Sequence, residues 1–227
     1  MTWNRLGQVF EDAVPTLPGF LAPVVATART ARAEQFARFL PTEEHERHSA
    51  VLICFGVGDR GPDLLIIERA PDMRAHAGQP AFPGGALDHE DADAVAAALR
   101  EAQEETDVDP TGVLPFGTLP DLYLPVSDFV VTPVLAWWAE PSPVRVAAPA
   151  EVASVHRIPI ADLVQPANRC RVRHPSGYVG PGFEVAGLLV WGFTGGLIDA
   201  LLAGTGWAEP WDATRIVDLP PDGIDRS

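Results

Sequence analysis

The segment from Arg100 to Glu105 places three carboxylates on one side of a predicted helix. Because residues three and four positions apart are neighbours on a helix, Glu101, Glu104 and Glu105 fall within an arc of about 100°. Three carboxylates this close repel one another, which raises their pKa values unless a positive charge lies among them. Carboxylate oxygens are the ligands that hard cations such as Mg²⁺ or Mn²⁺ prefer. The segment therefore predicts either a solvated acidic helix face or a metal site.

The residues around these carboxylates favour the metal site. The apolar stripe that should face the core consists of Val95, Leu99, Ala102 and Thr106. N-terminal to the carboxylates, their own face carries only alanines, at positions 94, 97 and 98, which leave room for a bulky group against the helix. Arg100 precedes Glu104 by four residues, so we expect it to pair with that carboxylate and to hold it in one orientation.

A strand, a basic loop and a glycine turn precede the helix. Arg69 ends the predicted strand, and the loop after it carries Arg74 and His76. Gly84 and Gly85 allow a tight turn and a close approach of the backbone to a ligand, because they lack a Cβ. We expect the basic side chains to hold phosphates while a metal ion lies opposite them.

These motifs resemble those of a known family. Residues 85–108 are similar to the Nudix box, and its core, Arg-Glu-x-x-Glu-Glu, is matched by Arg100, Glu101, Glu104 and Glu105. The longer run resembles the extended signature of the coenzyme A pyrophosphatase branch and reads Arg69, Met73-Arg74-x-His76-x-Gly78-Gln79 and Phe82-Pro83-Gly84-Gly85. The resemblance is clear from residue 50 to residue 108 and looser as far as residue 202.

The chain departs from the family pattern at two places. The spacing from Gly85 to Arg100 is one residue longer than in the general box, which leaves the early acidic position open between Glu90 and Asp91. The glycine that usually follows the helix is replaced by Asp107. Aspartate tolerates the left-handed conformation better than most residues do, so we expect Asp107 to adopt it.

The resemblance implies an α/β fold, an α/β/α sandwich with a mixed β-sheet, and a pyrophosphohydrolase that requires Mg²⁺ or Mn²⁺. The implied substrate is coenzyme A or an acyl-CoA, cleaved at its pyrophosphate to 3′,5′-ADP and (acyl-)4′-phosphopantetheine. The implied metal ligands are Glu101 and Glu105, with Glu104 as a third ligand or as the catalytic base beside Arg100. The implied substrate-binding residues are Arg69, Arg74, His76, Gln79, Gly84 and Gly85. Glu151 is a further candidate for the base or for a metal ligand.

The sequence leaves three alternatives open. The enzyme could hydrolyse another nucleoside diphosphate, such as ADP-ribose. A catalytically silent sensor of CoA or a nucleotide on the same fold has no need of three box carboxylates. A structural metal site would require a closed set of ligands, and it would give no role to Arg74 or to the glycine turn.

Composition restricts the partners. The net charge of −15 opposes binding to long nucleic acids, whose affinity for proteins comes largely from basic contacts to phosphate. A small phosphorylated ligand is still allowed, because a local metal ion and a few arginines can invert the field. Cys54 and Cys170 lie far apart, and the sequence has neither a signal peptide nor a long apolar run. We therefore expect a cytoplasmic protein that does not enter a membrane, and the sequence leaves its oligomeric state open.

Patterning divides the chain into an N-terminal extension with a helix (1–47), a Nudix-like domain (48–205) and a C-terminal tail (206–227). Helices are predicted at 6–13, 30–40 and 192–203, besides the carboxylate helix. Strands are predicted at 49–55 and 64–67, which form a hairpin, and at 113–119, 129–138 and 151–159. Pro133 should make its strand an edge or a bulge. Residues 171–190 should form an antiparallel pair with residues 178–182 in the loop, and 140–149 and 208–227 should be connectors or tail.

Overall fold

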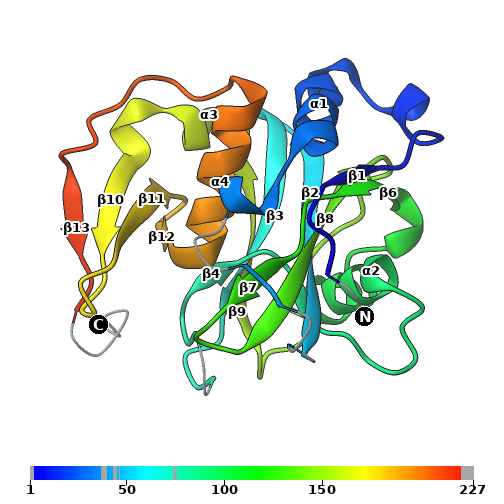
Figure 1. Ribbon diagram of the computed structural model, residues 1–227, viewed down its shortest axis with the longest axis horizontal. Coiled ribbons are helices and arrows are strands. Elements are labelled where there is room, and N and C mark those ends of the chain that lie inside the picture. Colours follow the sequence, from blue (N-terminus) through cyan, green and yellow to red (C-terminus); the bar gives the residue numbers. More distant parts are fainter. Residues whose placement is uncertain (1–2, 37–39, 43–44, 46, 74–75, 221–227) are drawn as a thin grey trace.

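The structure is a computed structural model that describes residues 3–36, 40–42, 45, 47–73 and 76–220. These residues form a nine-stranded mixed sheet with helices on both faces, and a second sheet of four strands beside it (Figure 1). The predicted α/β/α sandwich is confirmed. None of the helices in the described ranges is long and apolar enough to cross a membrane. The cytoplasmic location stays a prediction.

The main sheet has a continuous path of six strands and three strands attached beside it. The path runs through β1 (Gln8–Val9), β6 (Val113–Thr118), β8 (Phe129–Trp138), β2 (His48–Gly58), β3 (Gly61–Arg69) and β4 (Pro80–Ala81). The attached strands are β5 (Gly84–Ala86) on β2, β7 (Leu122–Leu124) on β8 and β9 (Val152–Pro159) on β3. Within this sheet the β2–β8 pair is parallel, and the other pairs are antiparallel.

The hairpin of β2 and β3 opens at one end, and this opening positions the site. The two strands pair with each other from Phe55 and Leu64 up to the turn between Gly58 and Gly61. Further from the turn, β2 pairs with β5 instead, and β3 pairs with β4. The segment that carries the predicted glycine turn is thus inserted into the sheet as two short strands, level with the end of β3.

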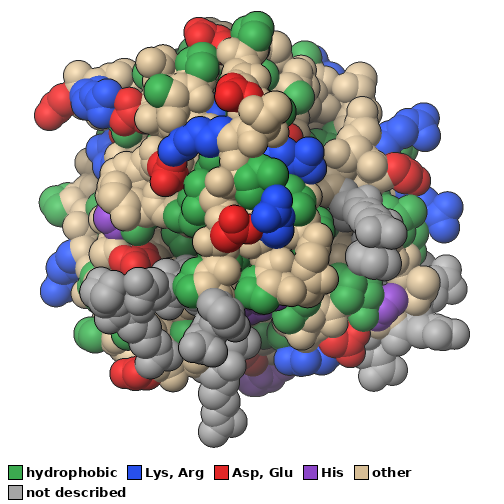
Figure 2. All heavy atoms as spheres, turned by 90° about the vertical axis from the view of Figure 1, so that its left-hand side faces the viewer, with side chains coloured by type: hydrophobic (Ala, Val, Ile, Leu, Met, Phe, Trp, Pro, Cys, Tyr) green, Lys and Arg blue, Asp and Glu red, His purple; other side chains and the backbone are tan. Residues whose placement is uncertain are grey.

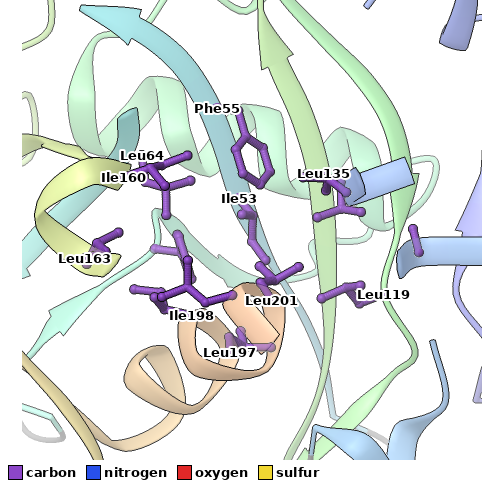
Figure 3. Close-up of a cluster of buried hydrophobic side chains, with 14 of the residues drawn as sticks. Ile53, Phe55, Leu64, Leu119, Leu135, Ile160, Leu163, Leu197, Ile198 and Leu201 are labelled. Atoms are coloured by element: carbon purple, nitrogen blue, oxygen red, sulfur yellow. The ribbon is translucent and has the colours of Figure 1, made fainter. Parts of the chain in front are cut away.

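Two apolar cores lie on the two faces of the main sheet. The α-helices are α1 (Ala22–Thr30), α2 (Ala94–Thr106), α3 (Ile160–Val164) and α4 (Gly192–Thr205). On one face, Ile53 and Phe55 of β2 and Leu135 of β8 pack against side chains of α3 and α4 (Figure 3). The same core includes Leu21, Val24 and Val25 of the N-terminal region. The opposite face is covered by α2. Short 3-10 helices occur at Val14–Thr16, Gly19–Leu21, Ala33–Gln35, Pro110–Gly112 and Pro166–Asn168.

The helix predictions for the N-terminal region are wrong. Residues 6–13 contain strand β1, which pairs with the end of β6. Residue 7 is a glycine at a close backbone contact, since a Cβ there would lie 2.2 Å from the carbonyl oxygen of Ala28. The predicted helix at 30–40 is displaced to Ala22–Thr30, with Pro23 in its first turn, where proline is tolerated. Residues 37–39 of that prediction lie outside the described part of the chain.

The prediction for Pro133 is also wrong, because β8 lies inside the sheet with partners on both sides. Pro133 lies where the pairing of β8 with β6 ends, at Val134, and the pairing with β7 begins, at Val131. Its carbonyl oxygen accepts from the backbone N–H of Leu119 at 2.9 Å. The missing N–H of proline faces this junction, so the pairing with β2 is not interrupted.

The second sheet has the order β12-β11-β10-β13. Its strands are β10 (Arg169–Arg173), β11 (Val179–Val185), β12 (Leu188–Val190) and β13 (Ile216–Asp218). The predicted antiparallel pairing is present, but its first turn covers residues 174–178, and residues 179–182 are already strand. Positive and negative side chains are interspersed on this side of the molecule (Figure 2).

β13 corrects the prediction that residues 208–227 are only connector or tail. It pairs in parallel with Arg171–Arg173 of β10, far away in sequence. Three residues carry too little periodic signal to predict such a strand. The domain boundaries at residues 47 and 205 stay a prediction.

Helix α4 offers a test of glycine in a helix interior. Gly196 has open space where a Cβ would stand, whereas a Cβ at Gly195 would lie 3.0 Å from the carbonyl oxygen of Pro181. We expect Gly196→Ala to raise the free energy of unfolding by about 0.5–1 kcal/mol, because alanine loses less backbone entropy on folding. Gly195→Ala is the control and should gain nothing. Chemical denaturation measures both, and equal effects of the two changes would contradict this assignment.

Candidate active site

Helix α2 has a definite beginning and end. The carboxylate of Asp93 accepts from the backbone N–H of Ala96 at 2.9 Å and caps the N-terminus. The helix ends at Asp107, which is in the left-handed region with φ 59° and ψ 20°, as predicted. Its side chain accepts from Nε of Arg145 at 2.7 Å on the surface.

Asp107→Gly should stabilise the fold by about 0.5–1 kcal/mol, since glycine adopts the left-handed conformation without steric cost. The exposed ion pair with Arg145 that this change removes is worth little in water. Chemical denaturation is the measurement, with Arg145→Ala as the control that removes the ion pair alone. A clear loss of stability in Asp107→Gly, larger than that in the control, would show that the carboxylate has a structural role.

The alanines of α2 serve packing and do not leave room for a ligand, contrary to the sequence interpretation. Ala97 and Ala98 are fully buried and pack with Ala50 and Leu52 of β2. Small side chains let the helix lie close to the sheet. Because Glu105 projects from this same side of the helix, its carboxylate is buried as well.

Glu105 is anchored in an apolar setting. Only 2% of its surface is exposed, and Oε2 accepts from the backbone N–H of Gly84 at 2.9 Å. Burial raises the pKa of its carboxyl to about 8, and the charges of Glu101 and Glu151 act in the same direction. The N–H of Gly84 and the charge of Arg69 oppose this rise without cancelling it.

Glu101 occupies the space that Gly85 leaves open. A Cβ at Gly85 would lie 2.5 Å from Cδ of Glu101, so a larger residue there would displace the carboxylate. Burial raises the pKa of Glu101, Arg100 lowers it, and the nearby charges of Glu104 and Glu151 raise it further. The helix can therefore place the carboxylate of Glu101 against the glycine turn because Gly85 has no Cβ.

Arg100 joins the helix to the loop before it. Its Nη1 donates to Glu101 at 2.9 Å and to Glu104 at 3.2 Å, so the predicted pairing with Glu104 is present. Its Nη2 also donates to the carbonyl oxygen of Ala86 at 3.1 Å. Glu104 is 58% exposed, at the rim of the site. We interpret Arg100 as the residue that orients both carboxylates.

The acidic position that the sequence left open is filled by Asp91. Its two carboxylate oxygens accept from Nε and Nη2 of Arg100 at 3.1 and 2.9 Å, and this pairing lowers the pKa of Asp91. Glu90 is exposed and contacts His89 instead. Spacing alone could not separate two adjacent acids, because the choice depends on the path of the loop.

The basic loop after β3 is folded back on itself. Arg69 and Gln79 are joined by a backbone hydrogen bond of 3.1 Å, and the side chain of Gln79 lies 3.1 Å from Nδ1 of His76. His76 has a positive φ of 56°. The structure thus brings His76, Gln79 and Arg69 together, while Arg74 lies outside the described residues.

Arg69 has an unused donor beside the carboxylates. Its Nε is buried and has no hydrogen-bond partner among the described residues. Its charge acts on Glu105, which places the guanidinium close to that carboxylate. A buried donor without a partner is costly, so an acceptor that arrives with a ligand, such as a phosphate oxygen, would satisfy it.

Glu151 completes the group from a distant part of the chain. Its carbonyl oxygen accepts from the backbone N–H of Ala70 at 2.8 Å, directly after β3, and its charge acts on both Glu101 and Glu105. No local spacing relates residue 151 to residue 105, which is why the sequence offered it only as a candidate.

The donor set fits a hard divalent cation that is shared with substrate. Within the described ranges, no three Asp, Glu, His or Cys side chains form a ready-made metal cage. Mg²⁺ usually binds one or two carboxylates and completes its shell with waters and substrate phosphates. Glu101 and Glu105 offer carboxylates whose repulsion a cation would relieve, and Arg69 offers its free Nε to the phosphate.

A carboxylate helix that follows a glycine turn at the open end of a mixed sheet defines a class of hydrolases that act on nucleoside diphosphate-linked compounds. The chain belongs to the NUDIX domain family, which matches residues 46–176, more than half of its length. It is 44% identical over 135 residues to the uncharacterized Nudix hydrolase NudL of Salmonella paratyphi B, covering 58% of this chain and 69% of that protein. It is 46% identical over 121 residues to the uncharacterized Nudix hydrolase NudL of Salmonella heidelberg, covering 53% of this chain and 62% of that protein.

Solved structures with related folds are more distant in sequence. The Nudix hydrolase RenU of M. smegmatis is 18% identical with a TM-score of 0.49, covering 73% of this chain and 89% of that one. The NUDIX domain of Shewanella oneidensis NrtR, solved with ADP ribose, is 21% identical with a TM-score of 0.43, covering 59% of this chain and 86% of that one.

Proposed function

We propose that the chain is a Mg²⁺- or Mn²⁺-dependent diphosphatase that cleaves coenzyme A or an acyl-CoA to 3′,5′-ADP and (acyl-)4′-phosphopantetheine. The observation that supports a diphosphate substrate is the unpartnered Nε of Arg69, whose charge acts on the buried carboxylate of Glu105. Support for coenzyme A comes from the run of matching residues between Arg69 and Gly85, which extends well beyond the metal helix.

Some residues of the site would bind the cation or the phosphates, and others hold those residues in position. Glu101 and Glu105 would hold the cation, which supplies positive charge against the diphosphate and acidifies water. The N–H of Gly84 fixes Glu105, and Arg100 fixes Glu101. Arg69 offsets the charge of the phosphates, as would Arg74.

Two carboxylates are candidates for the proton acceptor. Glu104 lies at the rim and is held by Arg100. Glu151 is exposed, and its charge acts on the carboxylates of both Glu101 and Glu105. The pH–rate profiles of Glu104→Gln and Glu151→Gln decide between them, because only the loss of the base removes the ascending limb.

A substrate panel read by product mass tests the proposal. It contains CoA, acyl-CoAs, dephospho-CoA, ADP-ribose, NADH and dinucleoside polyphosphates, each with Mg²⁺, with Mn²⁺ and with a chelator. CoA compounds should give the highest kcat/KM, and the chelator should abolish activity. A preference for ADP-ribose of tenfold or more, about 1.4 kcal/mol in the transition state, would overturn the CoA assignment and leave a Nudix hydrolase of another nucleoside diphosphate. Tight CoA binding without cleavage of any compound would indicate a sensor instead.

A further inference from the structure

A cavity of about 580 Å³ lies beside the edge of the main sheet that β1 and β6 form (Figure 1). Three segments that are far apart in the sequence build it: residues 10–16, residues 111–114 at the start of β6, and residues 137–140 at the end of β8. Its volume lies in the range of small-molecule binding sites. The diphosphatase function gives this cavity no role.

The cavity is separate from the candidate active site. Trp137, which lines it, pairs with Phe55 of β2, and both pack into the core on the face of the main sheet away from α2. Gly85 pairs with Ala50, which lies five residues away along β2 and faces α2. Five residues of a strand span about 17 Å. A small ligand in the cavity would therefore not contact the carboxylates of α2.

The charged side chains that line the cavity are negative. They are Asp12 and Glu140, and no basic side chain of the described residues lines it. Both carboxylates are exposed and have no ion-pair partner in the described part of the chain, whereas Glu11 and Asp162 each pair with an arginine. A hollow with apolar walls and charges of one sign concentrates their field. The cavity should therefore attract a cation.

The cavity also contains two aromatic side chains, Phe10 and Trp137. Trp137 is half-buried, and its ring packs edge-on with that of Phe20 at a centroid distance of 5.7 Å and an angle of 76°. Tryptophan is the best aromatic partner of a cation, because the face of its ring carries partial negative charge. The rings favour an ammonium group over a hard metal ion, whose preferred ligands are oxygen atoms.

Backbone contacts hold the walls of the cavity in place. The N–H of Glu140 donates to the carbonyl oxygen of Gly112 at 3.1 Å, and a Cβ at Gly112 would lie 2.3 Å from the carbonyl oxygen of Glu140. On the other side, the N–H of Phe10 donates to the carbonyl oxygen of Phe116 at 2.9 Å. Walls that are fixed before binding reduce the entropy that is lost when a ligand binds.

We propose that this cavity binds a small organic cation, an ammonium group that carries an apolar body. Trp137 and Phe10 contact the cation, and Asp12 and Glu140 supply the negative charge that attracts it. This ligand class differs from the proposed substrate, which is an anion. The site is independent of the diphosphatase function.

Calorimetry with choline, a small quaternary ammonium ion, tests the proposal. The control ligand is its uncharged analogue, in which a tert-butyl group replaces the trimethylammonium group. The wild type should bind choline about tenfold or more tightly than the analogue, because only the cation interacts with the carboxylates and with the negative face of the ring.

Variants then assign the binding to this cavity. The double variant Asp12→Asn/Glu140→Gln should bind choline about tenfold more weakly, whereas Glu209→Gln, at an exposed acid outside the cavity, should differ from the wild type by less than about twofold. Trp137→Leu keeps an apolar wall and should lose about fivefold in affinity. Hydrolysis by the double variant should stay at the wild-type rate.

Three results would overturn the cation site. They are no detectable binding of choline by the wild type, equal affinity for choline and the uncharged analogue, and wild-type affinity in the double variant. The two acids are exposed, so their replacement should leave the fold intact, and thermal unfolding verifies this. The substrate panel tests the proposed function separately. A wild type that binds choline but cleaves no compound of the panel would refute that function and retain the cation site.

Discussion

Glu105→Gln is expected to reduce turnover by orders of magnitude and at the same time to stabilise the metal-free protein at alkaline pH. The loss of turnover follows from the loss of a cation ligand. The gain in stability follows from burial, which raises the pKa of this carboxyl from 4.5 to about 8. The folded protein then binds the proton more tightly than the unfolded chain does, so stability is lost as pH rises from 4.5 toward 8. Glutamine stays neutral, and its carbonyl oxygen can still accept from Gly84.

The measurement is thermal unfolding without metal between pH 5 and pH 8. One pKa unit corresponds to about 1.4 kcal/mol, so the variant should gain on the order of 2 kcal/mol or more at pH 8, roughly 5 °C in Tm, and little near pH 5. Glu104→Gln is the matched control, because Glu104 is mostly exposed. It should reduce activity with no comparable pH-dependent gain. The same pH dependence of Tm in the wild type and in Glu105→Gln would contradict the burial argument. Near-normal hydrolysis in both variants with excess Mg²⁺ would contradict the assignment of these carboxylates to a metal site.

Gly85→Ala should abolish most of the activity while the fold survives. The new methyl group would take the place of the carboxylate of Glu101, only 2.5 Å away, and would turn it from its bond with Arg100. The clash is with the end of a side chain, which can rotate, so the free energy of unfolding should change by no more than about 1 kcal/mol. A misplacement of about 1 Å at a catalytic group can lower kcat/KM on the order of 100-fold.

Gly84→Ala provides the contrast for this experiment. A Cβ at Gly84 would lie 2.2 Å from the carbonyl oxygen of Ala50, and a paired backbone cannot move aside. This variant should lose stability as well as activity, whereas Gly196→Ala should lose neither. Wild-type kcat/KM in Gly85→Ala, or a loss of stability as large as that in Gly84→Ala, would disprove the fit between Gly85 and Glu101.

The parts of the site that could be predicted from the sequence are those fixed by short-range geometry. Helical spacing brings Glu101 and Glu105 to the same region, and the left-handed conformation of Asp107 follows from the end of the helix. The glycine turn was predictable because two adjacent glycines allow a close approach. The turn approaches the carboxylate of Glu101 on one side and β2 on the other. Neighbouring residues in the sequence do not predict these two contacts.

Long-range pairing accounts for what the sequence did not predict. Periodicity identifies a face of a helix but not what covers it. The sequence therefore predicts space for a ligand at the alanines of α2, whereas in the structure they pack on the sheet. The pairings of β1 with β6 and of β13 with β10 involve only two and three residues, too few for any pattern. Glu151 reaches the site because β9 pairs with β3, which ends at Arg69.

The hydrogen bonds that α2 makes to β5 have a consequence for local motion. Glu105 accepts from the N–H of Gly84, and Arg100 donates to the carbonyl oxygen of Ala86, so side chains of the helix are tied to the backbone of a strand that itself pairs with β2. The helix therefore cannot tilt away from the sheet without breaking these two hydrogen bonds to its backbone. Helix and glycine strand should open as one cooperative unit, protected from hydrogen exchange to the same degree as the interior strands. The positions of the carboxylates should then be lost only when this unit opens.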